Sequence, residues 1–246
     1  MNLFASAVAW ILDPGHWTNG PDISAHLLEH LAVSGVCVLI AVVIALPIGI
    51  AIGHTGTGRG AAILISNVAR ALPTLGLLSI LILLLGIGLL PITIVLVILA
   101  IPPMLAGAYA GVESVDRQTV DAARGMGMTE WQIIARVELP LALPLLIGGL
   151  RATALQVIAT LGLASAFAFG GLGIYLINGL TQFDFTQLLA GAILITALAL
   201  LVDGLLAVVQ RFVVPRGVAH GRSDPNTPQK RTSARRRRAL QEGMQS

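Results

Sequence analysis

Residues 26–53, with the sequence HLLEHLAVSGVCVLIAVVIALPIGIAIG, decide the class of fold. Apart from Glu29 the stretch contains no acidic residue, lysine or arginine, and most of it is Val, Ile, Leu, Ala and Gly. A helix that crosses the hydrocarbon core of a bilayer needs about 20 consecutive apolar residues, so this stretch is long enough to cross with some tilt. It predicts a transmembrane helix.

The whole sequence has the composition of a membrane protein. Of its 246 residues, 56% are hydrophobic and 11% are charged, whereas roughly 25% of the residues of an average soluble domain are charged. The N-terminus has no basic segment followed by a cleavage site, so we expect the first spanning helix to serve as the targeting signal. The single cysteine, Cys37, lies inside that helix and provides no disulfide framework.

Four more apolar stretches extend the prediction to an all-α integral membrane protein with five transmembrane helices. The second span is interrupted by polar residues and by Pro73, and the third carries Pro102 and Pro103, which neighbouring helices make tolerable in a membrane. The predicted spans are residues 26–53, 61–85, 92–111, 141–164 and 188–213. The chain is thereby divided into an N-terminal segment 1–24, a membrane domain 25–214 with a polar insert at 113–140, and a disordered basic tail 215–246.

The basic residues of the loops all fall on one side of this arrangement. Arg59, the arginines of the insert and the basic residues of the tail share that side, whereas the N-terminus and the other two loops contain no lysine or arginine. Short loops rich in Lys and Arg stay in the cytoplasm. We therefore expect a multi-pass protein of the cell membrane, with the N-terminus outside and the insert and C-terminus in the cytoplasm.

The polar insert is predicted to form two short helices. Asp116 is a good N-cap for the first helix, which the Gly-Met-Gly of residues 125–127 should break. Thr129 and Gln132 have the spacing of a capping box, so a second helix should follow until Pro140 ends it. One interpretation is an amphipathic hairpin that rests on the membrane surface.

The insert also resembles a specific motif. It contains Asp121-Ala122-Ala123, then Gly127, then Val137-Glu138-Leu139-Pro140. This is similar to the EAA loop of type I ABC importer permeases, in which Glu-Ala-Ala, three residues, Gly, nine residues and Ile-x-Leu-Pro follow one another; here Asp replaces Glu and Val replaces Ile. In that family the loop is a cytoplasmic coupling helix that docks in a groove of the ATPase subunit, and small residues allow the partner to approach closely. The resemblance implies that the coupling residues are Asp121, Ala122, Ala123, Gly125, Gly127, Leu139 and Pro140.

Further segments resemble the permeases of the osmoprotectant, or quaternary-amine, uptake group. They are RALPT at 70–74, RGMGMT at 124–129, FGGLGI at 169–174 and NGL at 178–180. The similarity covers residues 26–217. It implies the type I ABC importer transmembrane fold and identifies residues 25–214 as an ABC transmembrane type-1 domain.

This resemblance implies a function and a set of partners. Such a permease moves glycine betaine, choline, carnitine or proline betaine, together with a second identical or homologous permease, a dimer of ATPase subunits that binds ATP and Mg²⁺, and an extracytoplasmic solute-binding protein. The chain itself would then be no enzyme and would bind no cofactor, metal or nucleic acid. Methionine importer permeases share several of these features, so another small solute such as methionine is the alternative. A secondary transporter or channel is a further alternative, but it has no reason to build a small-residue docking helix.

Aromatic residues and glycines gather in the loop after the fourth span. The candidates for an external gate or a receptor contact are Phe169, Gly170, Gly171 and Gly173, and an interfacial aromatic belt is the alternative. Aromatic faces bind quaternary ammonium groups best, yet the first four spans contain only Tyr109 and, at the edge, Phe167. We therefore expect the receptor, rather than the helix bundle, to supply the affinity for solute.

Three ionisable residues, Arg70, Arg151 and Asp203, lie inside the predicted spans at similar depths. An unpaired charge at the centre of a bilayer costs on the order of 3 kcal/mol on insertion scales. We therefore predict an intramembrane polar cluster in which Asp203 pairs with one of the two arginines. Snorkelling of the side chains to the cytoplasmic interface is the alternative.

The glycines of residues 53–60 superficially suggest a nucleotide-binding loop. No strand precedes them, and the sequence contains no Gly-Lys-Ser or Gly-Lys-Thr, so the chain has no P-loop of its own. No cluster of His, Cys and acidic residues has the spacing of metal ligands. The sequence therefore favours a transport subunit over an enzyme.

Overall fold

The computed structural model describes residues 2–18, 22–167 and 170–213, and within these ranges all regular secondary structure is helical. The tail at 215–246 and Phe169 lie outside the described residues. The all-α fold predicted from the sequence is confirmed.

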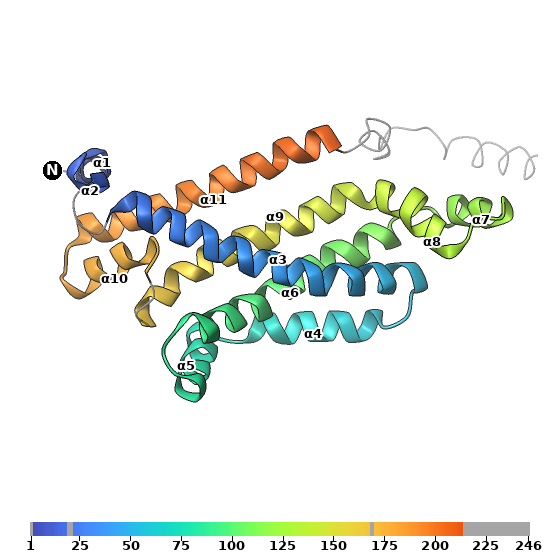
Figure 1. Ribbon diagram of the computed structural model, residues 1–246, viewed down its shortest axis with the longest axis horizontal. Helices are drawn as coiled ribbons and strands as arrows, with labels where there is room; N and C mark the ends of the chain where they lie inside the picture. The colour runs from blue at the N-terminus through green and yellow to red at the C-terminus, as the bar shows by residue number, and fades with distance from the viewer. Residues whose placement is uncertain (1, 19–21, 168–169, 214–246) are drawn as a thin grey trace, which may run out of the picture. The chain divides into compact units, whose positions relative to one another are not determined.

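Within the described residues, four helices are long and apolar enough to cross a membrane. They are α3 (Ile23–Thr55), α6 (Leu89–Glu113), α9 (Leu139–Ala164) and α11 (Phe185–Val213). Helix α6 packs against α3 on one side and α9 on the other, and α11 packs on α9 (Figure 1). The bounds of α3, α6 and α11 lie within a few residues of the predicted spans.

Small residues allow these helices to approach closely. A Cβ atom added to Gly107 of α6 would lie 2.5 Å from the Cα atom of Gly149 on α9. Because lipid tails are as apolar as the side chains, helix association in a membrane depends on close packing of this kind. The glycine pair therefore fixes where α6 and α9 cross.

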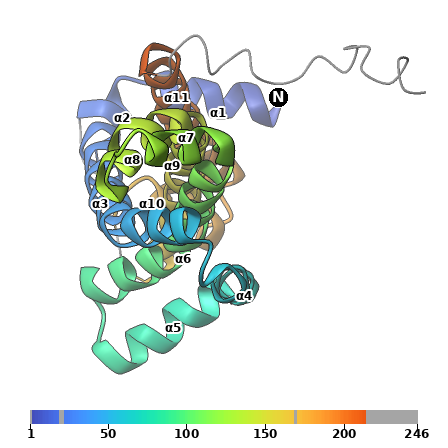
Figure 2. The same ribbon diagram turned by 90° about the vertical axis from the view of Figure 1, so that its right-hand side faces the viewer.

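The predicted second span is bent into two helices. Helix α4 (Arg59–Ala71) and α5 (Thr74–Leu85) meet at an angle of 85°, which Figure 2 shows from the end of the molecule. Pro73 has no N–H and disfavours helical geometry at the preceding residue, and Leu72 is extended with ψ of 128°. The interruption that the sequence predicts at Pro73 is a bend between two helices, and the described residues contain five spans if this bent pair counts as one.

The polar insert between α6 and α9 folds as three short helical segments. They are α7 (Arg117–Gly125), α8 (Glu130–Ile133) and the π-helical turn η1 (Ile134–Glu138). The prediction that Pro140 ends the second helix was wrong, because helix continues from Glu130 to Phe167. In the π turn the N–H of Leu139 donates to the carbonyl of Ile134, five residues earlier. Pro140 then lies in the first turn of α9, where its missing N–H costs the helix no hydrogen bond.

The opposite end of the four long helices carries the remaining short helices (Figure 1). They are α1 (Leu3–Leu12), α2 (Gly15–Thr18), the 3₁₀ turn η2 (Ser165–Phe167) and α10 (Gly173–Thr181). Helix α1 is too short to span a bilayer, as predicted, and it packs against α11 through the fully buried Ala7. Helix α10 lies within the stretch that the sequence analysis treated as a loop.

Candidate functional site

The local geometry of the insert follows from its capping residues. Asp116 caps α7, its side chain accepting the N–H of Gln118 at 2.9 Å. Thr129 and Gln132 form both hydrogen bonds of a capping box at the start of α8. Between the helices Gly127 has a φ of +84°, a conformation that side chains disfavour. The predicted helix, break and second helix start are confirmed.

The insert has a small apolar core of its own. Val115, Val120, Ala123 and Ile133 are all buried there. Ala123, one of the predicted coupling residues, is only 2% exposed in the isolated chain, and its role in docking stays a prediction. It occupies the inward face of α7, one turn after Val120, where α7 packs on α8 and η1. Ala123 therefore holds the insert together.

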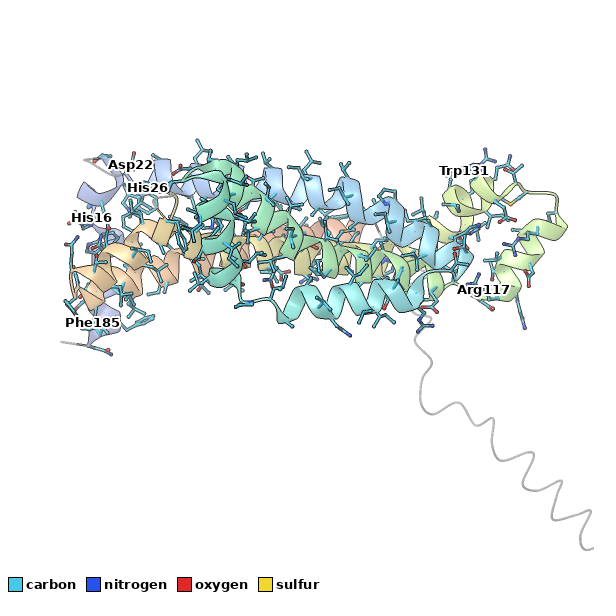
Figure 3. The ribbon with its side chains drawn as sticks, turned by 90° about the horizontal axis from the view of Figure 1, so that it is seen from below. His16, Asp22, His26, Arg117, Trp131 and Phe185 are labelled. Carbon is cyan, nitrogen blue, oxygen red and sulfur yellow. The ribbon has the colours of Figure 1, made fainter. Side chains whose placement is uncertain are left out.

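The outward face of the insert is apolar at two positions that the sequence analysis missed. Met126 is 76% exposed and Trp131 is 80% exposed, and Figure 3 shows Trp131 on the outer edge of the insert, at the end of the molecule opposite His16 and Phe185. Ala122, Gly125 and Gly127 are exposed beside them. The available signal was a tryptophan and a methionine inside an otherwise polar segment, because large exposed apolar side chains mark contact surfaces.

Charged side chains join α7 to α8 across the insert. Arg124 lies 3.2 Å from Asp121, and its Nε and NH2 atoms donate to the two carboxylate oxygens of Glu130 at 2.8 and 3.0 Å. The hydrogen bond to Glu130 raises the pKa of the Arg124 guanidinium above its usual range. Asp121, the first residue of the EAA-like motif, therefore bonds within the insert.

The insert also contacts the end of α3. The ring of His54, in the last turn of α3, lies 2.7 Å from Glu138 and 3.1 Å from Glu130. Arg117 of α7 donates to the carbonyls of Gly53 and His54 at 3.4 and 3.5 Å. Leu139 and Pro140, the last residues of the motif, are half-buried where the insert joins α9.

At the other end, the glycine turn before α10 is tied to α3. The N–H of Gly171 donates to Glu29 at 2.7 Å, and the N–H of Leu172 donates to the buried ring of His30 at 3.3 Å. His30 in turn bonds the carbonyl of Ile158 on α9 at 3.1 Å. The structure thus places Gly170, Gly171 and Gly173 in one turn beside α3 and α9.

Within the spans, the structure brings two of the three predicted ionisable residues together. Arg151 on α9 and Asp203 on α11 form two hydrogen bonds of 2.7 Å each. Gln210 joins them, accepting from Arg151 at 3.2 Å and donating to the carbonyl of Pro144 at 3.0 Å. Arg70 lies on α4, and its side chain is outside the described part of the chain.

A cavity of about 390 Å³ lies beside the bend between α4 and α5. Its lining residues are Ala69, Leu72, Thr74, Leu99, Pro103, Ala152 and Gln156. No aromatic side chain is among these lining residues, so this cavity offers no face on which a quaternary ammonium group would stack.

A multi-pass bundle with a folded polar insert between two of its long helices defines a class of membrane transport subunits. Residues 41–216 match the family described as binding-protein-dependent transport system inner membrane component, and the chain belongs to that family. Its multi-pass, inner-membrane character follows from this membership and from the apolar helices.

Curated relatives align with most of the chain. It is 35% identical over 201 residues to the glycine betaine/carnitine/choline transport system permease protein OpuCB of Bacillus subtilis, covering 82% of this chain and 93% of the relative. It is 35% identical to the carnitine transport permease protein OpuCB of Listeria monocytogenes, covering 83% and 94%. The osmoprotectant import permease protein OsmW of Salmonella typhimurium is 29% identical, covering 81% and 95%.

A solved structure shares the fold. Inward-facing conformations of the MetNI methionine ABC transporter include a chain that matches with a TM-score of 0.70 and 24% identity, covering 82% of this chain and 99% of that one. The predicted type I ABC importer transmembrane fold is confirmed.

Proposed function

We propose that this chain is the permease subunit of an ATP-driven importer for quaternary-amine osmoprotectants such as glycine betaine, choline, carnitine or proline betaine. The observation that carries the proposal is the alignment, over more than four-fifths of the chain, with permeases named for these solutes. Methionine is the weaker alternative, because the methionine transporter is similar in fold at 24% identity.

The insert is the proposed contact with the ATPase subunit. Its outward face presents Met126 and Trp131 to solvent beside the small residues Ala122, Gly125 and Gly127. An exposed tryptophan suits insertion into a groove of a partner, where aromatic anchors supply much of the binding energy. ATP and Mg²⁺ are then held by a dimer of such partners.

The arrangement of basic residues supports the proposed orientation. The insert contains Arg117, Arg124 and Arg136, whereas the described N-terminal residues contain no lysine or arginine. We therefore propose that the insert and the basic tail 215–246 lie in the cytoplasm, and that residues 1–24 and the glycine turn before α10 lie outside.

The solute path requires further proteins. A second permease, identical or homologous, would form the path together with the membrane domain 25–214. An extracytoplasmic solute-binding protein would deliver solute to the outer end of the path, where the candidate gate consists of Gly170, Gly171 and Gly173. Affinity would reside in that receptor, since a path that releases its cargo gains nothing from tight binding.

Reconstitution tests the proposal directly. The chain and the ATPase that co-purifies with it are placed in vesicles with the receptor, and uptake of labelled glycine betaine, choline, carnitine and methionine is measured with and without ATP. We expect ATP-dependent uptake of one or more quaternary amines. Uptake of methionine alone would overturn the solute assignment, and uptake without an ATPase would overturn the transporter class.

A further inference from the structure

His54 occupies an unusual place at the end of the first spanning helix. It lies in the last turn of α3, is 11% exposed in its side chain, and has a carboxylate oxygen beside each ring nitrogen: Glu138 Oε2 lies 2.7 Å from Nδ1, and Glu130 Oε2 lies 3.1 Å from Nε2. Ionised carboxylates only accept hydrogen bonds, so each nitrogen of the His54 ring faces an acceptor.

Glu138 depends on this contact. Its side chain is 1% exposed, and His54 is its partner in the described structure. A buried carboxylate is costly unless it is paired and hydrogen-bonded. In the EAA-like motif Glu138 occupies the variable position of Val-x-Leu-Pro, which is why the resemblance assigns it no role.

The contact completes a chain of alternating charges across the insert. In order, the residues are Asp121, Arg124, Glu130, His54 and Glu138. The first belongs to the Asp-Ala-Ala half of the motif and the last to the Val-x-Leu-Pro half, while His54 comes from α3, 84 residues before Glu138. The end of α3 therefore lies between the two halves of the motif.

These contacts affect how a displacement of the insert is transmitted to the spanning helices. The insert is joined to α6 and α9 through the backbone, so a displacement reaches those helices directly. It reaches α3 through side chains: the two contacts of His54 with Glu130 and Glu138, and Arg117, which donates to the last carbonyls of α3. Short charge-assisted hydrogen bonds fix both the distance and the orientation between the groups that they join.

We propose that His54 is a positioning residue that ties the end of α3 to the insert, so that a displacement imposed on the insert by the ATPase subunit moves α3 together with α9. The proposal rests on the proposed function, because it concerns how ATP use is converted into movement of the path. His54 itself contacts neither solute nor nucleotide.

A single substitution would not distinguish a loss of coupling from a loss of folding stability. His54→Leu strands the buried Glu138, so it weakens both the link and the fold. The double variant His54→Leu with Glu138→Leu removes the His54 link without a stranded buried charge and leaves the bonds of Arg117 to α3 in place. Replacing a buried ion pair by apolar residues is often neutral for folding. We expect the double variant to recover assembled complex but not coupling.

The measurement is the amount of glycine betaine taken up per ATP hydrolysed in reconstituted vesicles. We expect this ratio to fall about three- to tenfold in the double variant, which lies within the roughly two- to 30-fold effect of residues that modulate coupling between sites. The matched control is Arg59→Gln, which breaks an exposed ion pair with Glu113 at the end of α6 and leaves the contacts of His54 untouched. Its ratio should equal that of the wild type.

The results separate two kinds of failure. If the wild type takes up solute with ATP and the assembled double variant does so at the same ratio, the role of His54 is overturned. If the wild type shows no ATP-driven uptake, the proposed function falls, and the coupling role falls with it.

A distance measurement provides a second readout that stability alone would not change. Spin labels at Thr57 and Gln118, both exposed, report the separation between the end of α3 and α7. We expect one narrow distance with and without ATP in the wild type and a broadened distribution in the double variant. An unchanged distribution in the double variant would overturn the tie between α3 and the insert.

Discussion

Arg151 on α9 and Asp203 on α11 meet in a two-pronged ion pair, with Nε to Oδ1 and NH2 to Oδ2 distances of 2.7 Å each. The two residues are 52 positions apart, and their side chains are 31% and 24% exposed in the isolated chain. The parallel arrangement of two hydrogen bonds is the geometry that guanidinium and carboxylate groups prefer. The pair joins α11, the last of the four long helices, to the rest of the bundle.

The first prediction is that this pair stabilises the assembled permease as a unit. Arg151→Gln or Asp203→Asn alone should lower the yield of folded protein in detergent, because each strands an opposite charge within a span. The double variant should recover much of the yield, giving an interaction energy on the order of 1–3 kcal/mol in a double-mutant cycle. Thermal unfolding of the four proteins measures it.

The same cycle with Arg70→Gln in place of Arg151→Gln is the control. Arg70 belongs to α4, a helix that packs against α6. Its effect should add to that of Asp203→Asn. If the effects of Arg151→Gln and Asp203→Asn also add, the observed pair contributes nothing to stability in the membrane. Snorkelling would then account for all three residues.

The second prediction concerns orientation. Cysteine at Thr181, exposed at the end of α10, should react with a membrane-impermeant thiol reagent applied to intact cells, whereas cysteine at Thr129 in the insert should react only after permeabilisation. The native Cys37 is fully buried and should stay silent. Labelling of position 129 from outside would reverse the proposed topology.

The third prediction tests the outward face of the insert. Trp131→Ala should weaken binding of the ATPase subunit by about 30-fold, which is the roughly 2 kcal/mol expected of an aromatic anchor at an interface. Met126→Ala should have a smaller effect in the same direction. Binding of the separated ATPase subunit to the permease in lipid nanodiscs measures both.

Phe212→Ala is the matched control for Trp131→Ala. Phe212 is 84% exposed near the end of α11, so the substitution removes a comparable aromatic surface outside the insert. It should leave binding unchanged. Equal losses for Phe212 and Trp131 would show that general hydrophobicity, rather than docking of the insert, holds the partner.

Features that depend on local chemistry could be predicted from the sequence. The length of an apolar run predicts a span, and the carboxylate of Asp116 or the Thr129 and Gln132 pair predicts a helix start, because each effect acts within one turn of helix. The break at Gly127 follows in the same way from its conformational freedom. These elements appear in the structure at the predicted places.

Features that depend on tertiary packing could not be predicted in the same way. Pro73 and Pro140 both favour a helix boundary. Pro73 lies at a bend of 85° between α4 and α5, whereas Pro140 lies at the start of α9, which a π turn joins to α8. The burial of Ala123 depends on where Ile133 packs. The contact of His54 with Glu138 joins residues far apart in the chain, and a histidine in an apolar helix gives no sign of its partner.

The last prediction compares two glycines of the insert that differ in conformation. Gly127 has a φ of +84°, whereas Gly125 lies in the last turn of α7 with ordinary helical geometry. A Cβ atom at either position would meet no other atom within 4 Å. Gly127→Ala therefore introduces backbone strain without a clash, at a cost of about 1–2 kcal/mol, while Gly125→Ala should be neutral or slightly stabilising.

The strain at residue 127 acts on the turn that sets α7 against α8, so it should shift the insert before it affects the spans. We expect Gly127→Ala to leave insertion in the membrane intact, to speed hydrogen exchange of the α7 amides and to weaken ATPase binding, with Gly125→Ala close to wild type in all three measurements. Faster exchange and weaker binding in both variants would mean that the added methyl group itself obstructs the partner. Wild-type behaviour of Gly127→Ala would show that the positive φ is not needed for docking.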